Sequence, residues 1–329
     1  MSILVTGGAG YIGSHMVLEL VDSGEKVIVL DDLSTGFAAT VPEGVVLVRG
    51  DAGDRALLLR LIAEHEIEAI AHFAAKIVVP DSVADPLGYY LGNTVKSRNL
   101  IEAAVHGGVK QVIFSSTAAV YGNPRENPVG EDARPDPVSP YGRSKLMTEW
   151  MLQDAGRAHG LRHVALRYFN VAGADPKGRA GQSTPRATHL IKAAVQVALG
   201  ERPFLEVFGT DYPTKDGSCL RDYIQVTDLA RAHLAALAHL RTGGDSLTLN
   251  CGYGAGFSVL EVVEVVKRVS GVDFEVKLSP RREGDPAAII AKADRIRAEL
   301  GWTPQHDDLD AIVAQALAWE KRLIDQRAA

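Results

Sequence analysis

The chain has 329 residues, 46% of them hydrophobic and 23% charged, which is the balance of a folded globular protein and excludes a disordered or fibrous one. Lys and Arg number 35 against 41 Asp and Glu, so the formal net charge of -6 argues against a general nucleic-acid binder. The sequence has no apolar run of ~20 residues, so we expect no membrane span. It also has no basic segment followed by an apolar one near its start, so we do not expect export. Cys219 and Cys251 are too few for a disulfide framework, and we expect two buried free thiols in a cytoplasmic protein.

In the first half of the chain, short apolar runs alternate with amphipathic stretches and short glycine-containing turns. The pattern predicts strands at 3–5, 26–30, 45–48, 69–73, 111–115 and 163–167, and helices at 11–22, 54–64, before Gly107 and at 139–159. Apolar strands separated by helices pair in parallel through right-handed crossovers, with both faces of the sheet covered. We therefore expect an α/β fold, a doubly wound parallel Rossmann sheet.

After about residue 168 the rhythm changes, because two loops at 172–188 and 211–218 are rich in Gly, Pro and charged residues. Helices are expected to resume at 189–198, 226–240, 259–269 and 309–324. We interpret 1–170 as a cofactor-binding Rossmann domain and 171–329 as a smaller, mainly substrate-binding lobe over the carboxyl edge of the sheet. Residues 221–250 are predicted to return to the first domain.

Three glycines, Gly7, Gly10 and Gly13, follow the first strand and open the first helix. The first permits a tight turn, the second lets the backbone approach a pyrophosphate, and the third lets helix and strand pack closely. Such glycines also mark other tight turns, so the loop alone is a weak signal. Asp31 ends the second strand, where a carboxylate binds the adenosine ribose diol and repels a 2′-phosphate. Unless Asp31 merely caps a helix, the combination predicts NAD rather than NADP.

Tyr141 and Lys145 lie four residues apart on the helix predicted at 139–159, and therefore on one face of it. A tyrosine pKa near ~10 must fall by roughly 2–3 units for proton abstraction at neutral pH. A neighbouring ammonium and an oxidised nicotinamide cation both favour the phenolate. Thr117 ends the strand at 111–115 with a hydroxyl in reach of the same substrate oxygen, unless it serves only as a turn or capping residue.

Seven segments appear in an order that resembles a known family: TGGAGYIG (6–13), HFAA (72–75), SSTAAVYG (115–122), SPYGRSK (139–145), LRYFN (166–170), RDYIQVTDLA (221–230) and PRREGD (280–285). Together they resemble the extended short-chain dehydrogenases/reductases, and within them the UDP-galactose 4-epimerases. The resemblance runs from about residue 3 to the last predicted helix. It implies NAD as the cofactor, a UDP-sugar as the substrate and no metal.

The resemblance assigns roles residue by residue. Tyr141 is the base, Lys145 lowers its pKa, and Thr117 steadies the sugar 4-oxygen. The positions assigned to the cofactor are Gly7, Gly10, Tyr11, Ile12, Gly13, Asp31, Asp32, Asp51, Ala52, Phe73, Ala74, Ala75, Asn93, Ser115, Tyr141, Lys145 and Tyr168. The positions assigned to the substrate are Thr117, Tyr141, Asn170, His189, Phe208, Arg221, Tyr223, Arg282, Asp285 and Ile289.

Several positions depart from the family pattern. Gly92 replaces a cofactor-side asparagine, although Asn93 remains, and Ile77 stands where a lysine is usual, with Lys76 one residue earlier. These departures predict altered retention of NAD. His189 replaces an asparagine of some relatives, either touching the substrate or serving as an ordinary helix histidine. Ile289 is intermediate between the tyrosine that closes the pocket to N-acetyl groups and the small residues that open it.

The expected reaction is interconversion of UDP-galactose and UDP-glucose through a 4-keto sugar. The alternative is a 4-epimerase or decarboxylase acting on another UDP-sugar, such as UDP-glucuronate or UDP-N-acetylglucosamine. A 4,6-dehydratase is disfavoured because Ala118-Ala119 replaces its Asp-Glu pair. The resemblance also implies a homodimer through helices at 91–105 and 145–157, for which the candidate side chains are Ile101, Val105, Leu146, Trp150 and Met151, unless these pack on the sheet.

Overall fold

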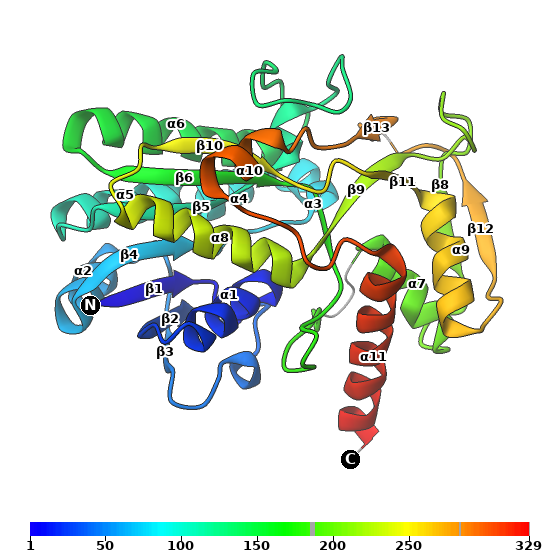
Figure 1. Cartoon of the computed structure of the whole chain (residues 1–329), viewed down its shortest axis with the longest axis horizontal. Coiled ribbons are helices and arrows are strands. Elements are labelled where there is room, and N and C mark those ends of the chain that lie inside the picture. Colours follow the sequence, from blue (N-terminus) through cyan, green and yellow to red (C-terminus); the bar gives the residue numbers. More distant parts are fainter. Residues whose placement is uncertain (185–187, 283, 329) are drawn as a thin grey trace.

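The structure is a computed structural model that describes residues 1–184, 188–282 and 284–328. Within these residues, seven parallel strands form one twisted sheet in the order β10-β6-β5-β4-β1-β2-β3 (Figure 1). Their bounds are β1 Ser2–Thr6, β2 Val27–Asp31, β3 Val46–Arg49, β4 Ile67–His72, β5 Gln111–Thr117, β6 Arg162–Tyr168 and β10 Leu247–Cys251. This order, which reverses direction beside β1, confirms the doubly wound parallel sheet predicted from the alternating pattern.

Helices cover both faces of this sheet. Successive side chains of a strand point to opposite faces, so each strand contributes to two separate cores. Ile3 and Val5 of β1 join a core with α1 (Tyr11–Asp22) and α8 (Val226–Arg241), whereas Leu4 joins a core with α2 (Arg55–His65), α5 (Lys96–His106) and α6 (Pro140–His159). Both cores are almost completely buried, as strands packed between two helical layers require.

A second lobe lies beyond the carboxyl ends of the strands, on the right in Figure 1. Its separate core joins residues of three helices, α7 (Leu190–Ala198), α9 (Val259–Ser270) and α11 (Leu309–Ala328), all close to the predicted positions. The sequence pattern missed β10 of the large sheet and α10 (Asp294–Leu300), which packs against β10 and α8. It also missed the short strands beyond that sheet: β7 Asn170–Ala172, β8 Leu205–Phe208, β9 Leu220–Gln225, β11 Gly256–Ser258, β12 Val276–Ser279 and β13 Ala288–Ile289. Strands such as β8, β9 and β12 contain charged residues and are only partly buried, so no continuous apolar run marks them in the sequence.

The chain crosses between the two parts several times. α8 packs against α1, and β10 pairs in parallel with β6 at the edge of the large sheet. The domain boundaries at 1–170 and 171–329, with 221–250 returning, stay a prediction. The loop expected at 172–188 contains residues 185–187, which lie outside the described residues; the part at 173–184 is almost free of regular structure.

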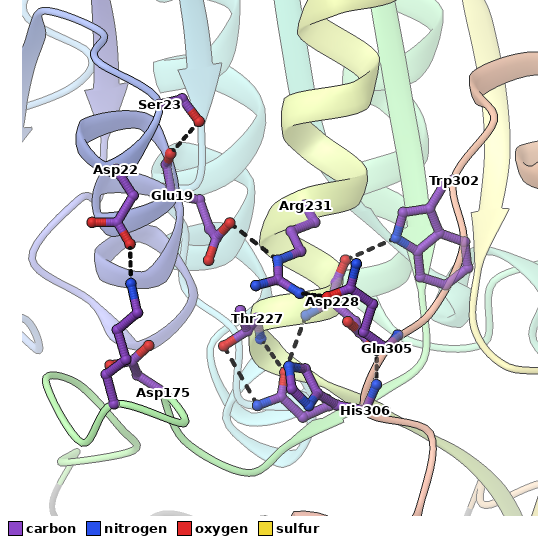
Figure 2. A network of polar contacts seen from close by, with 12 residues as sticks. Glu19, Asp22, Ser23, Asp175, Thr227, Asp228, Arg231, Trp302, Gln305 and His306 are labelled. Atoms are coloured by element: carbon purple, nitrogen blue, oxygen red, sulfur yellow. Dashed lines mark hydrogen bonds and ion pairs between the residues drawn. The ribbon is translucent and has the colours of Figure 1, made fainter.

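A network of polar contacts ties α8 to its surroundings (Figure 2). The buried carboxylate of Asp228 accepts the backbone N–H groups of Gln305 (2.9 Å) and His306 (2.8 Å), and the indole of Trp302 donates to the Asp228 carbonyl (3.0 Å). Arg231 donates to Glu19 of α1 (3.2 Å). The segment that leads into α11 is therefore fixed to the large sheet's helical layer.

The single long helix expected before Gly107 is instead a series of shorter pieces. α3 (Val79–Ala84) ends just before Asp85, α4 (Pro86–Tyr89) follows, and a π-helical turn (Tyr90–Val95) leads into α5. Pro86 lacks the N–H that a continuous helix would need, and the Asp85 carboxylate caps the new helix by accepting the N–H of Gly88 (2.9 Å). Among the described helices, none is long and apolar enough to cross a membrane.

Candidate active site

The carboxyl ends of the central strands open onto a cavity of about 470 Å³. Most of the predicted cofactor residues and several predicted substrate residues line it: Gly7, Gly10, Tyr11, Ile12, Gly13, Asp31, Asp32, Asp51, Ala52, Phe73, Ala74, Ala75, Ser115, Thr117, Tyr141, Tyr168, Asn170 and His189. Its volume suits a large organic ligand. Residues from widely separated motifs therefore surround one space.

The glycine loop lines this cavity, and two of its glycines, Gly7 and Gly13, leave no room for a side chain. Gly7 has a φ of 72°, in the left-handed region, and a Cβ there would lie 2.6 Å from the backbone nitrogen of Ala74. A Cβ on Gly13 would lie 2.1 Å from the Gly7 carbonyl oxygen. α1 begins at Gly10 without a side-chain cap and without an acidic residue in its first turn. The open N–H groups of that turn are a ready site for a pyrophosphate.

Asp31 stands at the carboxyl end of β2, in the wall of the cavity. Its Oδ2 accepts the N–H of Ala9 (2.9 Å), and its Oδ1 accepts the N–H of Leu33 (2.8 Å). Burial raises the pKa of Asp31, while these two backbone hydrogen bonds oppose the rise. The carboxylate is held rigidly beside the glycine loop, and its remaining lone pairs can accept hydrogen bonds from a ribose.

Thr117, Tyr141 and Lys145 lie together at the end of β5 and the start of α6. Ser139 caps α6 by accepting the N–H of Gly142 (3.2 Å), and Pro140 occupies the first helical position, as predicted. Tyr141 shares a hydrogen bond with Thr117. Lys145 is buried and donates from Nζ to the Ser115 carbonyl (2.8 Å). Thr117 also accepts the N–H of Ala119 (3.1 Å), so its hydroxyl serves as a turn cap as well.

Burial acts on these two titratable groups in opposite directions. It raises the pKa of Tyr141 to about 12, against a smaller lowering by the hydrogen bond from Thr117. It lowers the pKa of Lys145 to about 7. Both shifts favour neutral side chains, because a low-dielectric site penalises each isolated charge. A phenolate and an ammonium formed side by side would stabilise one another.

A buried polar row lies one residue behind these groups. Ser116, Arg167 and Asn250 are register partners on β5, β6 and β10. Glu149, one helical turn beyond Lys145, binds Arg167 through both carboxylate oxygens (3.0 and 2.6 Å) and accepts from Ser116. The row directly in front contains Thr117 and Tyr168. This satisfied network holds the strand ends that carry the site.

Two predicted cofactor residues do not reach the wall of the cavity. Lys145 lies just behind Ser115, and Asn93 is buried behind Lys76. The Asn93 amide accepts the Lys76 N–H (2.8 Å) and donates to the Lys76 carbonyl (2.9 Å) and to Ser144 (3.0 Å). The stem of Lys76 lies over Gly92, with its ammonium above the Tyr89 ring. Asn93 therefore shapes the wall from behind.

The remaining predicted substrate residues form a second group on the smaller lobe. Arg221 of β9 lies 3.7 Å from the Asp285 carboxylate, and Arg282 stacks at 3.7 Å over the ring of Phe208. Ile289 pairs in register with Arg221 and is buried in the core. Tyr223, two residues along β9, lines a small pocket that also contains Asn170 and His189. Of this group only Tyr223 lines the small pocket, which adjoins the large cavity through Asn170 and His189, whereas Phe208, Arg221, Arg282, Asp285 and Ile289 line neither.

Sequence reasoning missed several lining residues. These are Leu30, Ser34, Thr35, Gly50, Lys96, Phe169, Val171, Gln182 and Thr184. Lys76, Ile77 and Gly92, which the sequence had already placed on the cofactor side, also line the cavity. Lys96 forms an ion pair with Asp51 (2.7 Å), which lowers the pKa of that carboxyl. Gln182 lies in the Gly-rich loop expected after residue 172, and the composition of that loop did not indicate which residue reaches inward.

The fold and the paired tyrosine and lysine define a dinucleotide-dependent enzyme of the Rossmann class. The chain matches the profile of the NAD dependent epimerase/dehydratase family over residues 3–252, and it belongs to that family. UDP-glucose 4-epimerase of Azospirillum brasilense is 58% identical over 321 residues, covering 98% of this chain and 92% of that protein.

Solved structures of epimerases are also similar to this chain. The crystal structure of UDP-glucose 4-epimerase from Brucella ovis in complex with NAD has a TM-score of 0.94 and 43% identity, covering 96% of this chain and 97% of that one. The UDP-Glc/GlcNAc 4-epimerase from Campylobacter jejuni has a TM-score of 0.86 and 47% identity, covering 98% and 99%. The cofactor of this protein is therefore NAD. The uncapped start of α1, the close glycines and Asp31 fit its pyrophosphate and ribose.

Proposed function

We propose that the protein interconverts UDP-galactose and UDP-glucose. The sugar is oxidised at C4 to a 4-keto intermediate, rotates in the pocket, and is reduced on its opposite face. NAD, when bound, supplies the hydride acceptor and donor for C4. The observation that carries the proposal is the buried Tyr141 hydroxyl, which pairs with Thr117 in the wall of the cavity that also holds the glycine loop and Asp31.

Tyr141 removes the proton from the 4-hydroxyl as C4 is oxidised, and returns it when C4 is reduced. Lys145 stabilises the phenolate, since its ammonium becomes favourable only when an anion stands beside it. Thr117 holds the 4-oxygen against the Tyr141 hydroxyl. Because proton and hydride return to the same oxygen and carbon, the reaction leaves no net redox change.

The nucleotide half of the substrate supplies the binding energy. Arg221 and Arg282 suit phosphate oxygens, Phe208 offers a flat apolar surface, and Asp285 accepts hydrogen bonds from a ribose. Asn170 and His189 extend this set to the large cavity. Tight binding of the nucleotide leaves the sugar loosely held, which its rotation requires. Ile289 is buried beside Arg221, and its branched side chain restricts an N-acetyl group, so N-acetylated sugars turn over more slowly.

A homodimer is part of the proposal. A stripe of exposed apolar side chains at four-residue spacing runs from α3 to the start of α5 and contains Val83, Leu87 (79% exposed), Leu91 (59% exposed) and Val95. The side chain of Trp150 on α6 is also exposed. An apolar stripe of this length favours burial against a second copy. Leu87→Asp combined with Leu91→Asp should give a monomer in sedimentation velocity, whereas Val272→Asp on the other lobe should not.

Of the other side chains considered for the interface, the structure places Ile101 and Leu146 in the cores of a single chain. Val105 and Met151 pack against the same core as Ile101. The apolar pattern of these four residues therefore reflects packing within the subunit. We expect the protein to act in the cytoplasm, in keeping with its two buried free cysteines, Cys219 and Cys251.

The test is incubation of the purified protein, without added NAD, with UDP-galactose, followed by proton NMR. We expect conversion to an equilibrium mixture of UDP-glucose and UDP-galactose, which shows epimerisation and retained NAD together. Conversion only after NAD is added would support the proposed reaction and indicate that the protein, with Gly92 and Ile77 in place of the usual residues, binds NAD weakly. The absence of conversion in both conditions, with turnover of UDP-glucuronate instead, would contradict the proposed substrate.

A further inference from the structure

One wall of the substrate region is residues 181–183, a segment outside the helices and strands in which Gly181 forms an isolated bridge with Ala174. Gln182 lines the large cavity and also the adjoining small pocket, which contains the candidate substrate residues Asn170, His189 and Tyr223. The Gln182 amide nitrogen lies 3.4 Å from Nδ1 of His189. A shift of this segment would therefore move the Gln182 side chain and alter its contact with His189.

The last helix, α11, holds this segment from outside, and α11 lies beside α7 (Figure 1). The Trp319 indole packs where Gly181 has no side chain, since a Cβ there would lie 2.4 Å from the Trp319 Cγ. The indole N–H donates to the Ser183 hydroxyl (3.2 Å). The residues on both sides of Gln182 are thus packed against one side chain of α11.

The next residue of α11 acts on Gln182 itself through a buried ion pair. Lys192 of α7 and Glu320 are both buried, and Lys192 Nζ donates to Glu320 Oε2 (2.6 Å) and to the Gln182 carbonyl oxygen. The other carboxylate oxygen of Glu320 accepts from the Gln196 amide (2.9 Å). A buried ammonium stays charged only with such a partner, so Glu320 maintains the bond from Lys192 to Gln182.

We propose that Trp319 and Glu320 make the C-terminal helix a positioning element of the UDP-sugar site, acting through Lys192 and Gln182. This inference rests on the proposed function. Thr117, Tyr141 and Lys145 belong to β5 and α6, and the glycine loop and Asp31 belong to the β1–α1–β2 unit. Loosening the segment therefore weakens binding of the UDP-sugar while leaving the chemical step and the cofactor in place.

The test compares Glu320→Gln with Asp325→Asn, an exposed site on the same helix that undergoes the same loss of charge. With NAD-loaded enzyme, KM and kcat for UDP-galactose, the Kd of UDP by titration calorimetry and the NAD content are measured. We expect Glu320→Gln and Gln182→Ala to raise KM about 3- to 10-fold. The values of kcat and NAD content should stay within about twofold, and Asp325→Asn should match the wild type.

A second variant separates positioning from simple stability, because Glu320→Gln also leaves a buried ammonium unpaired. The double variant Lys192→Met/Glu320→Leu removes both charges and should regain the thermal stability of the wild type. It should still show the raised KM, since Gln182 has lost its donor. Recovery of KM together with stability would overturn the proposal, as would an unchanged KM in Glu320→Gln. Lack of turnover by the wild type would instead refute the proposed function.

Discussion

Replacing Lys145 with Met should shift the pH dependence of epimerisation to higher pH. Burial, only partly offset by the Thr117 hydrogen bond, raises the pKa of Tyr141 to about 12, so at pH 8 only about one molecule in 10⁴ would carry the phenolate. For Tyr141 to be half ionised at pH 8, its pKa must fall by about four units, or ~5 kcal/mol. The Lys145 ammonium and the nicotinamide cation are the two positive charges that lower this pKa. If they contribute equally, the pKa of Tyr141 in Lys145→Met is higher by about two units, and kcat at pH 8 falls ~100-fold.

The direction of the shift in pH dependence distinguishes a raised pKa of Tyr141 from a general loss of structure in the variant. The reaction needs the ionised form of Tyr141, so a raised pKa makes the variant gain up to about tenfold in kcat per pH unit between pH 7 and 9. Turnover of UDP-galactose is followed by proton NMR with NAD in excess, since Lys145 also lies next to the cofactor-lining Ser115. A variant with the pH profile of the wild type, whatever its absolute rate, would refute the assignment of Lys145 as the stabiliser of the phenolate.

Three further predictions follow from the packing. Gly13→Ala should be purified without NAD, because the new Cβ would lie 2.1 Å from a carbonyl oxygen of the loop. Gly130→Ala, whose Cβ would make only an ordinary 3.7 Å contact, should keep NAD, and the absorbance of the extracted cofactor distinguishes the two. Glu149→Gln should lower the free energy of unfolding, measured in urea, by about 3–5 kcal/mol, because it leaves the buried Arg167 without its ion-pair partner. The double variant Glu149→Met/Arg167→Met removes both charges and should recover most of that loss. The Arg221 guanidinium is held by hydrogen bonds to two backbone carbonyls (2.8 and 2.9 Å), which Arg221→Lys would lose. In this variant KM for UDP-galactose should rise about tenfold with kcat unchanged. An unaltered KM would contradict a role of Arg221 in binding the diphosphate.

Local patterns were enough to predict six of the seven strands of the large sheet, all but the edge strand β10, and to place the glycine loop, Asp31 and the tyrosine–lysine pair. Buried strands between helices have an apolar run that the sequence displays directly, and the predicted positions of β1, β2, β5 and β6 agree with the structure within two residues at each end. Gly7, Gly10, Gly13 and Asp31 belong to one strand-helix-strand unit, and Tyr141 and Lys145 to one helical turn. Their relative positions are set by short-range geometry, so spacing was enough to predict them.

Tertiary structure alone decided which residues complete the walls of the site. Gln182 points into the cavity because Trp319 and Glu320, far along the chain, hold its segment, and no local pattern contains that contact. Asn93 turns away from the cavity because its amide matches the backbone of Lys76. Trp150 is exposed whereas Ile101 and Leu146 are buried, although all three are apolar residues on helices. Sequence patterns record the period of an element, but the direction of a side chain depends on which distant segment packs against it.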